Sequence, residues 1–169
     1  PSPLHSLFFV DDSRVDRSVC PDLAAMWADL VAVYAHEFAA LAAAGCRYVQ
    51  RDETTAVRMT EPKQMEFLRT HGIDPAKQFE KWMAVLDGVC RRKPAGMTLG
   101  IHICRGNGPR GSWFATGGYE PIADALFNGV AADRYLLEYD TERAGDFAPL
   151  RYLKGDKIAV LGVISTKDP

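Results

Sequence analysis

The sequence predicts an α/β fold in which parallel strands alternate with helices. Along its 169 residues, helical periodicity and short β-rich runs take turns, as they do in chains of βαβ units. Each predicted strand also ends in side chains capable of chemistry. Ligand sites in parallel α/β folds gather at the carboxyl ends of strands. A barrel and a doubly wound sheet would both produce this pattern.

The clearest element is a long amphipathic helix predicted over residues 22–44. Its apolar residues recur at helical spacing, with Pro21 before it and Gly45 after it, residues that are typical of helix ends. Three further helices are predicted, over residues 62–71, 75–92 and 119–128. Four strands are predicted, over residues 46–52, 97–103, 134–139 and 157–164. Residues 105–118 are predicted as a glycine-rich loop, and residues 146–152 as a short helical or turn segment.

Composition and charge exclude several classes of function. A hydrophobic content of 47% with 25% charged residues is that of a globular protein. The net charge of −2 argues against strong binding to nucleic acid or to an anionic membrane. No apolar run approaches the roughly 20 residues that span a bilayer, and the first nine residues lack the features of a signal peptide. Four scattered cysteines do not form a disulfide scaffold, so we expect reduced thiols in a cytoplasmic protein.

His102 and Cys104 form the sharpest candidate site. Two residues apart on a strand, they point to the same face, and both are ligands that Zn²⁺ prefers. A core histidine beside a buried cysteine is the alternative, and the spacing alone does not decide between them. Glu138 lies in an apolar strand where a carboxylate needs a partner, unless it emerges past the strand into water. His102, Cys104 and Glu138 are therefore the predicted zinc ligands.

Four segments carry a resemblance to a known family. They read G-C-R-Y-V-Q-R-D-E, H-I-C-R-G-N, W-F-A-T-G-G-Y-E-P-I-A-D-A-L-F and Y-L-L-E-Y-D-T-E-R-A-G-D-F. Together they resemble the shorter, single-barrel members of the cobalamin-independent methionine synthase family, nearly end to end. The resemblance implies that residues 1–169 form one domain, the central part of a (β/α)8 TIM barrel. A complete barrel needs about 250 residues, so further strands are expected on both sides.

The resemblance also implies an activity, which is zinc-dependent transfer of a methyl group from a 5-methyltetrahydrofolate to a thiol such as homocysteine, in methionine biosynthesis. By this resemblance Asp52 would contact the amino group of the thiol substrate. Asp52 and His102 are the expected catalytic residues. Gln50 and Glu53 are expected to bind substrate beside Asp52. Trp113 is expected to stack on a pterin ring, although it could equally pack under its loop.

The family's fourth zinc ligand, a second cysteine, has no counterpart among these residues. It lies beyond the strand that ends at Ser165. Cys46 begins a strand that ends at Asp52, so at about 3.3 Å per residue it lies roughly 20 Å from the site. Cys90 precedes a strand and lies at the same wrong end, and Cys20 is a remote candidate.

Two loops are open to more than one interpretation. Gly106 to Gly111 match G-x-G-x-x-G by letter, but Pro109 interrupts the match and the next helix starts only near Tyr119. Dinucleotide binding requires that helix to open within the turn. We interpret the loop as a flexible active-site loop that could bring Arg105, Arg110 or Trp113 to a substrate. The polar loop over residues 139–147 is either a substrate contact or a solvated loop.

Two alternatives to methyl transfer remain. One is an epoxide-opening transferase for coenzyme M thiol, which shares the His-x-Cys zinc signature. The other is a catalytically incomplete fragment that self-associates through exposed barrel edges. The expected partners are a small-molecule thiol and a methyl donor, without nucleic acid or membrane.

Overall fold

Four parallel strands form one sheet in chain order, β1-β2-β3-β4. They are β1 (Tyr48–Asp52), β2 (Thr98–Ile103), β3 (Arg134–Glu138) and β4 (Ile158–Gly162). The structure, a computed structural model, describes residues 1–4, 15–165 and 167, apart from the side chain of Arg110. Asp52 pairs with His102, and Glu138 pairs with Gly162, so the carboxyl ends of the strands meet at one edge. The predicted parallel α/β fold is confirmed.

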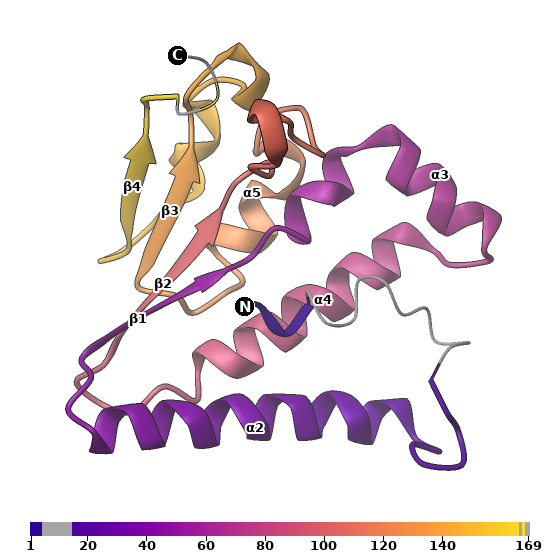
Figure 1. Cartoon of the computed structure of the whole chain (residues 1–169), viewed down its shortest axis with the longest axis vertical. Helices are drawn as coiled ribbons and strands as arrows, with labels where there is room; N and C mark the ends of the chain where they lie inside the picture. Colours follow the sequence, from indigo (N-terminus) through magenta and orange to yellow (C-terminus); the bar gives the residue numbers. More distant parts are fainter. Residues whose placement is uncertain (5–14, 166, 168–169) are drawn as a thin grey trace.

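Helices connect the strands, as the alternation in the sequence predicts. They are α2 (Leu23–Ala43), α3 (Pro62–Thr70), α4 (Pro75–Cys90) and α5 (Glu120–Phe127). α2 and α4 lie side by side (Figure 1). α5 is tied to β3, because the Tyr135 hydroxyl donates a hydrogen bond to the Leu126 carbonyl at 3.1 Å. The Asp22 carboxylate caps α2 by accepting a hydrogen bond from the Ala24 amide at 2.9 Å, and Gly45, with φ of +94°, follows its end. Among residues 1–4, 15–165 and 167, no helix is long and apolar enough to cross a bilayer.

One side of the sheet carries the hydrophobic core. Leu99, Ile101 and Ile103 of β2 are fully buried, as expected because successive side chains point to opposite faces of a strand. They belong to one cluster with Leu86 of α4 and Leu126 of α5. This packing fixes the strands against the helices and therefore fixes where each strand ends.

The opposite side of the sheet carries a second, more polar set of side chains. On β1, the exposed residues are Tyr48, Gln50 and Asp52. The Tyr48 hydroxyl lies over Gly100, where an added Cβ would come within 2.6 Å of it. The Arg134 guanidinium lies 5.5 Å from the centre of the Tyr48 ring. A side chain at position 100 would therefore displace Tyr48 and disturb this face.

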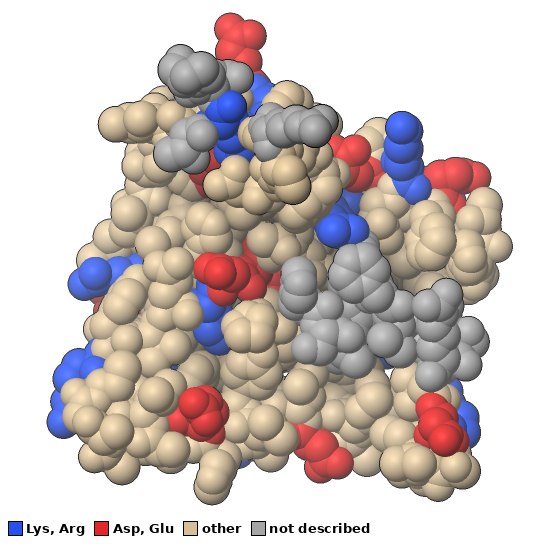
Figure 2. All heavy atoms as spheres, in the orientation of Figure 1, with Lys and Arg blue, Asp and Glu red and all other residues tan. Residues whose placement is uncertain are grey.

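β4 is an outer strand of the sheet, and it is apolar and exposed. Ile158, Val160 and Leu161 retain 48%, 41% and 39% of their accessible surface. Residues other than Lys, Arg, Asp and Glu cover most of the upper left of the molecule, where β4 lies (Figure 2). Within the described residues, the sheet has four strands and β1 does not pair with β4. The structure therefore shows a parallel sheet but does not show a complete barrel.

The predicted elements agree with the structure to within a few residues, except for the 3₁₀ turns. The strand predicted from residue 46 starts at Tyr48, and the helix predicted to residue 92 ends at Cys90. Residues 146–152 form a 3₁₀ helix, Ala148–Tyr152. Among the described residues, the prediction missed three 3₁₀ helices, Ala56–Thr60, Pro109–Gly111 and Glu142–Ala144. Turns this short carry too little periodicity to be recognised from the sequence.

Candidate functional site

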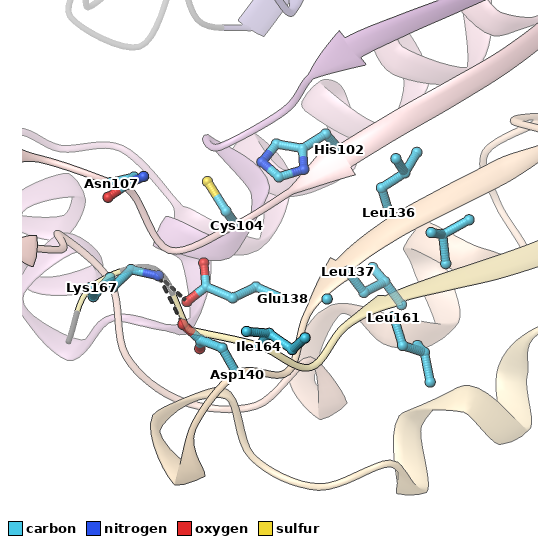
Figure 3. A pocket seen from close by; sticks show the side chains of 12 residues that line it. His102, Cys104, Asn107, Leu136, Leu137, Glu138, Asp140, Leu161, Ile164 and Lys167 are labelled. Atoms are coloured by element: carbon cyan, nitrogen blue, oxygen red, sulfur yellow. Dashed lines mark hydrogen bonds and ion pairs between the residues drawn. The ribbon is translucent and has the colours of Figure 1, made fainter. Parts of the chain in front are cut away.

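The carboxyl ends of β2, β3 and β4 surround a hollow of about 300 Å³, which we call the strand-end hollow. This volume is at the lower end of the range for small-molecule sites. Its polar lining consists of His102, Cys104, Asn107, Glu138, Asp140 and Lys167, and the remainder is mainly apolar. Figure 3 shows these side chains around the hollow.

The structure brings the three predicted zinc ligands to this one hollow. His102 and Cys104 lie two residues apart at the end of β2, and Glu138 ends the neighbouring strand β3. All three side chains line the hollow (Figure 3). Even so, no three His, Cys, Asp or Glu side chains of the described residues are gathered closely enough to hold a metal ion. The strand ends converge as predicted, but the donor atoms do not form a coordination shell.

The carboxylate of Glu138 is paired with cations. Arg143 Nη2 lies 2.8 Å from Glu138 Oε1, and Lys167 Nζ lies 3.2 Å from the same oxygen. The second oxygen accepts a hydrogen bond from the Arg105 amide at 2.9 Å. The sequence predicted that this buried carboxylate needs a positively charged partner. In the structure the partners are two cationic side chains, Arg143 and Lys167.

Asp140 completes this network of charges. Its oxygens lie 3.2 Å from Arg143 Nη2 and 3.0 Å from Lys167 Nζ. Burial works to raise the pKa of Asp140, but the hydrogen bond and charge of Lys167 and the charge of Arg143 outweigh it, so the pKa lies below its ordinary value. Asp140 therefore stays ionised and holds both cations beside the strand-end hollow.

The thiol of Cys104 is protonated in this setting. Burial raises its pKa, and the nearby charges of Glu138 and Asp52 raise it further. A hydrogen bond from the Gly106 amide, at 3.4 Å from Sγ, and the charge of Lys167 act in the opposite direction. Cys104 therefore needs an additional positive charge close to its sulfur before it can act as a thiolate.

Arg105 supports the site and does not face a substrate. Its side chain is buried and donates to the carbonyl oxygen of Gly117 at 3.0 Å from Nε and 2.7 Å from Nη2. Its Cζ lies 4.0 Å from the centre of the Tyr119 ring. The Tyr119 hydroxyl donates to the Ile103 carbonyl at 2.7 Å and accepts from the Glu138 amide at 2.9 Å. The prediction that Arg105 could contact a substrate is wrong, because its guanidinium ties the loop to the strand ends.

The predicted substrate-binding residues lie in different places. Asp52 is exposed at the end of β1, with Gln50 Nε2 3.4 Å from its Oδ1. Glu53 is fully buried and accepts hydrogen bonds from the Thr55 amide at 2.7 Å, the Ala56 amide at 3.0 Å and the Ser2 hydroxyl. The structure thus places Glu53 in the protein interior, where it anchors the 3₁₀ turn that follows β1. Its environment does not favour the predicted substrate contact.

Trp113 lies beside the strand-end hollow and not in it. Its side chain is 51% exposed, and Arg143 Cζ lies 4.5 Å from the centre of its ring. Trp113 and Lys167 line an adjacent hollow. The side chain of Arg110 lies outside the described residues. Lys167 was not predicted, although it follows the last strand closely and the same strand-end argument would have found it.

The donors of the strand-end hollow fit zinc in kind. An imidazole, a sulfur and a carboxylate are all ligands of this ion. A shell of His102, Cys104 and Glu138 would require the carboxylate of Glu138 to leave Arg143 and Lys167. Asp140 would remain to hold both cations. The residue types therefore fit a zinc ion, provided that the side chain of Glu138 rotates away from Arg143 and Lys167.

Comparison with known proteins agrees with the fold. No family model matches the chain. The uncharacterized protein YxjH of Bacillus subtilis is 36% identical over 168 residues, covering 99% of this chain and 44% of YxjH. The uncharacterized protein YxjG of the same organism is 36% identical over 124 residues, covering 73% of this chain and 32% of YxjG.

A solved structure extends the comparison to three dimensions. A candidate vitamin-B12-independent methionine synthase from Listeria monocytogenes superimposes with a TM-score of 0.70 at 31% identity. The match covers 96% of this chain and 44% of that protein. The two share their fold. The chain therefore spans less than half the length of the proteins to which it is similar.

Proposed function

We propose that this chain supplies the zinc-and-thiol face of an alkyltransferase that transfers a methyl group from a 5-methyltetrahydrofolate to a thiol such as homocysteine. The observation that carries the proposal is the convergence of His102, Cys104 and Glu138 on one hollow at neighbouring strand ends. Similarity in fold to a candidate methionine synthase supports it. Zinc is the proposed cofactor, and the small-molecule thiol and methyl donor are the proposed ligands.

The same proposal includes a (β/α)8 barrel of which residues 1–169 form one part. Four parallel strands are half of the number in such a barrel. Their helix-free face presents Tyr48, Gln50 and Asp52, as the inner wall of a barrel would. The remaining strands would pair along β1 and β4, and they would correspond to the part of the relatives that this chain does not match.

His102, Cys104 and Glu138 would hold the zinc ion. When bound, zinc would supply the positive charge that keeps a substrate thiol in its reactive thiolate form at neutral pH. Cys104 would lose its proton when it binds the metal. Without the metal, the raised pKa of its thiol keeps it neutral. Arg143 and Lys167 would stay beside the site through Asp140.

Asp52 would bind the amino group of the substrate. Its carboxylate stands exposed at the end of β1, next to β2, where an ammonium group could pair with it. Gln50, 3.4 Å away, would orient that carboxylate. The reacting thiol would thus lie between the adjacent ends of β1 and β2, with Asp52 on one side and the zinc ligand His102 on the other.

Zinc binding by matched variants tests the proposal. We expect the chain to bind about one zinc ion, and His102→Ala and Cys104→Ser to weaken binding by roughly 100-fold or more, because each removes a ligand. Competition with a chromogenic chelator measures the affinity. His36→Ala, on the exposed face of α2, and Cys46→Ser are the controls.

Thiol methylation is the second measurement. The same variants are assayed with 5-methyltetrahydrofolate and homocysteine, and with coenzyme M as the competing thiol. Unchanged zinc affinity in both His102→Ala and Cys104→Ser would refute the proposed function. Turnover of coenzyme M with an epoxide, without homocysteine methylation, would replace it by the alternative chemistry.

A further inference from the structure

A second hollow lies next to the strand-end hollow, and Lys167 lines both. Its volume is about 340 Å³, and its other lining residues are Trp113, Thr141, Glu142, Arg143 and Ser165. Two cations, one carboxylate, two hydroxyl groups and one aromatic ring therefore surround it. We call it the Arg143 hollow.

Arg143 has an unused hydrogen-bond donor. Its side chain is only 10% exposed, and Nη2 is occupied by Glu138 and Asp140. Nη1 is buried and has no hydrogen-bond partner among the described residues. A buried guanidinium nitrogen without an acceptor is costly. Arg143 lines the hollow, so we infer that a ligand bound there supplies the missing acceptor.

The charge balance around the hollow depends on Glu138. Arg143 and Lys167 share two carboxylates, those of Glu138 and Asp140. When Glu138 turns toward zinc, as the proposed function requires, the two cations keep Asp140 alone. Within this network two positive charges would then share one buried carboxylate, while the exposed Glu142 lines the hollow from the solvent side.

We propose that the Arg143 hollow binds a carboxylate group of a ligand whose reacting end lies in the strand-end hollow. A planar carboxylate matches the fork of a guanidinium, and the hydroxyls of Thr141 and Ser165 are potential donors in the same hollow. The half-exposed ring of Trp113 lies on the guanidinium and would cover the bound group. The charge argument rests on the proposed function, whereas the unused donor does not.

Two ligands could supply the carboxylate, and calorimetric titration distinguishes them. One pair of probes is L-methionine and L-methioninamide, which differ in the carboxylate of the amino acid. The other pair is 5-methyltetrahydrofolate and a 5-methyltetrahydropterin that lacks the benzoylglutamate tail. We expect the acid of one pair to bind about 10- to 100-fold more tightly than its neutral counterpart, as for a charge-assisted hydrogen bond.

Substitution of Arg143 tests the assignment. Arg143→Gln is expected to remove this preference while it leaves the affinity for the neutral probe unchanged, and Arg92→Gln, exposed beyond the end of α4, is expected to keep it. Circular dichroism verifies that each variant is folded. If Arg143→Gln does not fold, the double variant Thr141→Val, Ser165→Ala keeps the charges and is expected to weaken only the acid, by several-fold.

Titrations with and without zinc separate this inference from the proposed function. Zinc binding without any preference for a carboxylate, or a preference that Arg143→Gln leaves intact, would overturn the inference alone. A carboxylate preference that depends on Arg143, in a chain that binds no zinc, would support the inference and refute the proposed function.

Discussion

Two buried carboxylates, Glu53 and Glu138, show how strongly a residue's role depends on its partners. Glu138 ends a strand and meets the cations Arg143 and Lys167. Glu53, just past the end of β1, receives hydrogen bonds from amides and a hydroxyl group. The first is therefore held by two cationic side chains, whereas the second is fixed by the backbone and by Ser2.

Glu53 makes stability depend on pH. Burial raises its pKa, against the opposing effects of its hydrogen bonds with Ser2, Ala56 and Thr55 and of the charge of Arg51. An acid whose pKa is higher in the folded state stabilises the fold below its unfolded pKa, and this contribution is lost as the pH rises through the folded pKa. We therefore expect the unfolding free energy of the native chain to fall relative to that of Glu53→Gln over this window.

Urea unfolding at several pH values measures this difference. Glu37→Gln is the matched control, because it removes an exposed carboxylate on α2. A difference between the native chain and Glu53→Gln that stays constant with pH would contradict the expectation.

Part of the candidate site could be predicted from the sequence because it depends on local geometry. His102 and Cys104 share a face because strand side chains alternate, and that spacing is visible in the sequence. The strand-end argument extends to Lys167, but the partners of Glu53 and Lys167 lie far along the chain. Ser2 lies 51 residues from Glu53, and Lys167 lies 29 residues from Glu138. No short-range pattern encodes such pairs.

At the scale of elements, the strands and helices were predictable because burial imposes a period. Every second residue of β2 from Leu99 to Ile103 is an aliphatic side chain buried in the core, and α4 buries one face against the same core. The ties between elements were not predictable. Tyr119 joins β2 to β3 through a hydroxyl that reaches Ile103 and Glu138.

Removal of that hydroxyl is expected to loosen the strand ends. Tyr119→Phe leaves the Ile103 carbonyl and the Glu138 amide without this partner in a buried region. We expect a loss of about 1–3 kcal/mol in the free energy of unfolding, measured by urea denaturation. Tyr152→Phe, whose hydroxyl meets the exposed Arg151, is the control. Equal losses in the two variants would show that the Tyr119 hydroxyl does not join the strands.

At the scale of the whole molecule, the described sheet is open and covered by helices on one side. The exposed apolar residues of β4 present an unpaired strand edge, and such edges pair with other chains. We propose that the isolated chain self-associates through this edge.

Single lysine substitutions test that proposal. Ile158→Lys places a charge on β4 at a residue that is 48% exposed, and we expect it to shift the chain toward monomer in sedimentation velocity experiments. Val33→Lys makes the same change on α2, at a residue that is 64% exposed, and is expected to change nothing. If Ile158→Lys associates as strongly as the native chain, association uses another surface.

The single guanidinium of Arg105 serves three separate segments, because it donates to the backbone oxygens of Gly117, Glu138 and Ala144. The base of the glycine-rich loop is thereby fixed, while its tip, residues 107–114, is free of that anchor. Substitutions in the tip, whether natural or from a combinatorial library, could alter which molecules bind there without changing the strand ends beneath. An unchanged tether at Arg105 would then let the loop diversify while the strand ends stay in place.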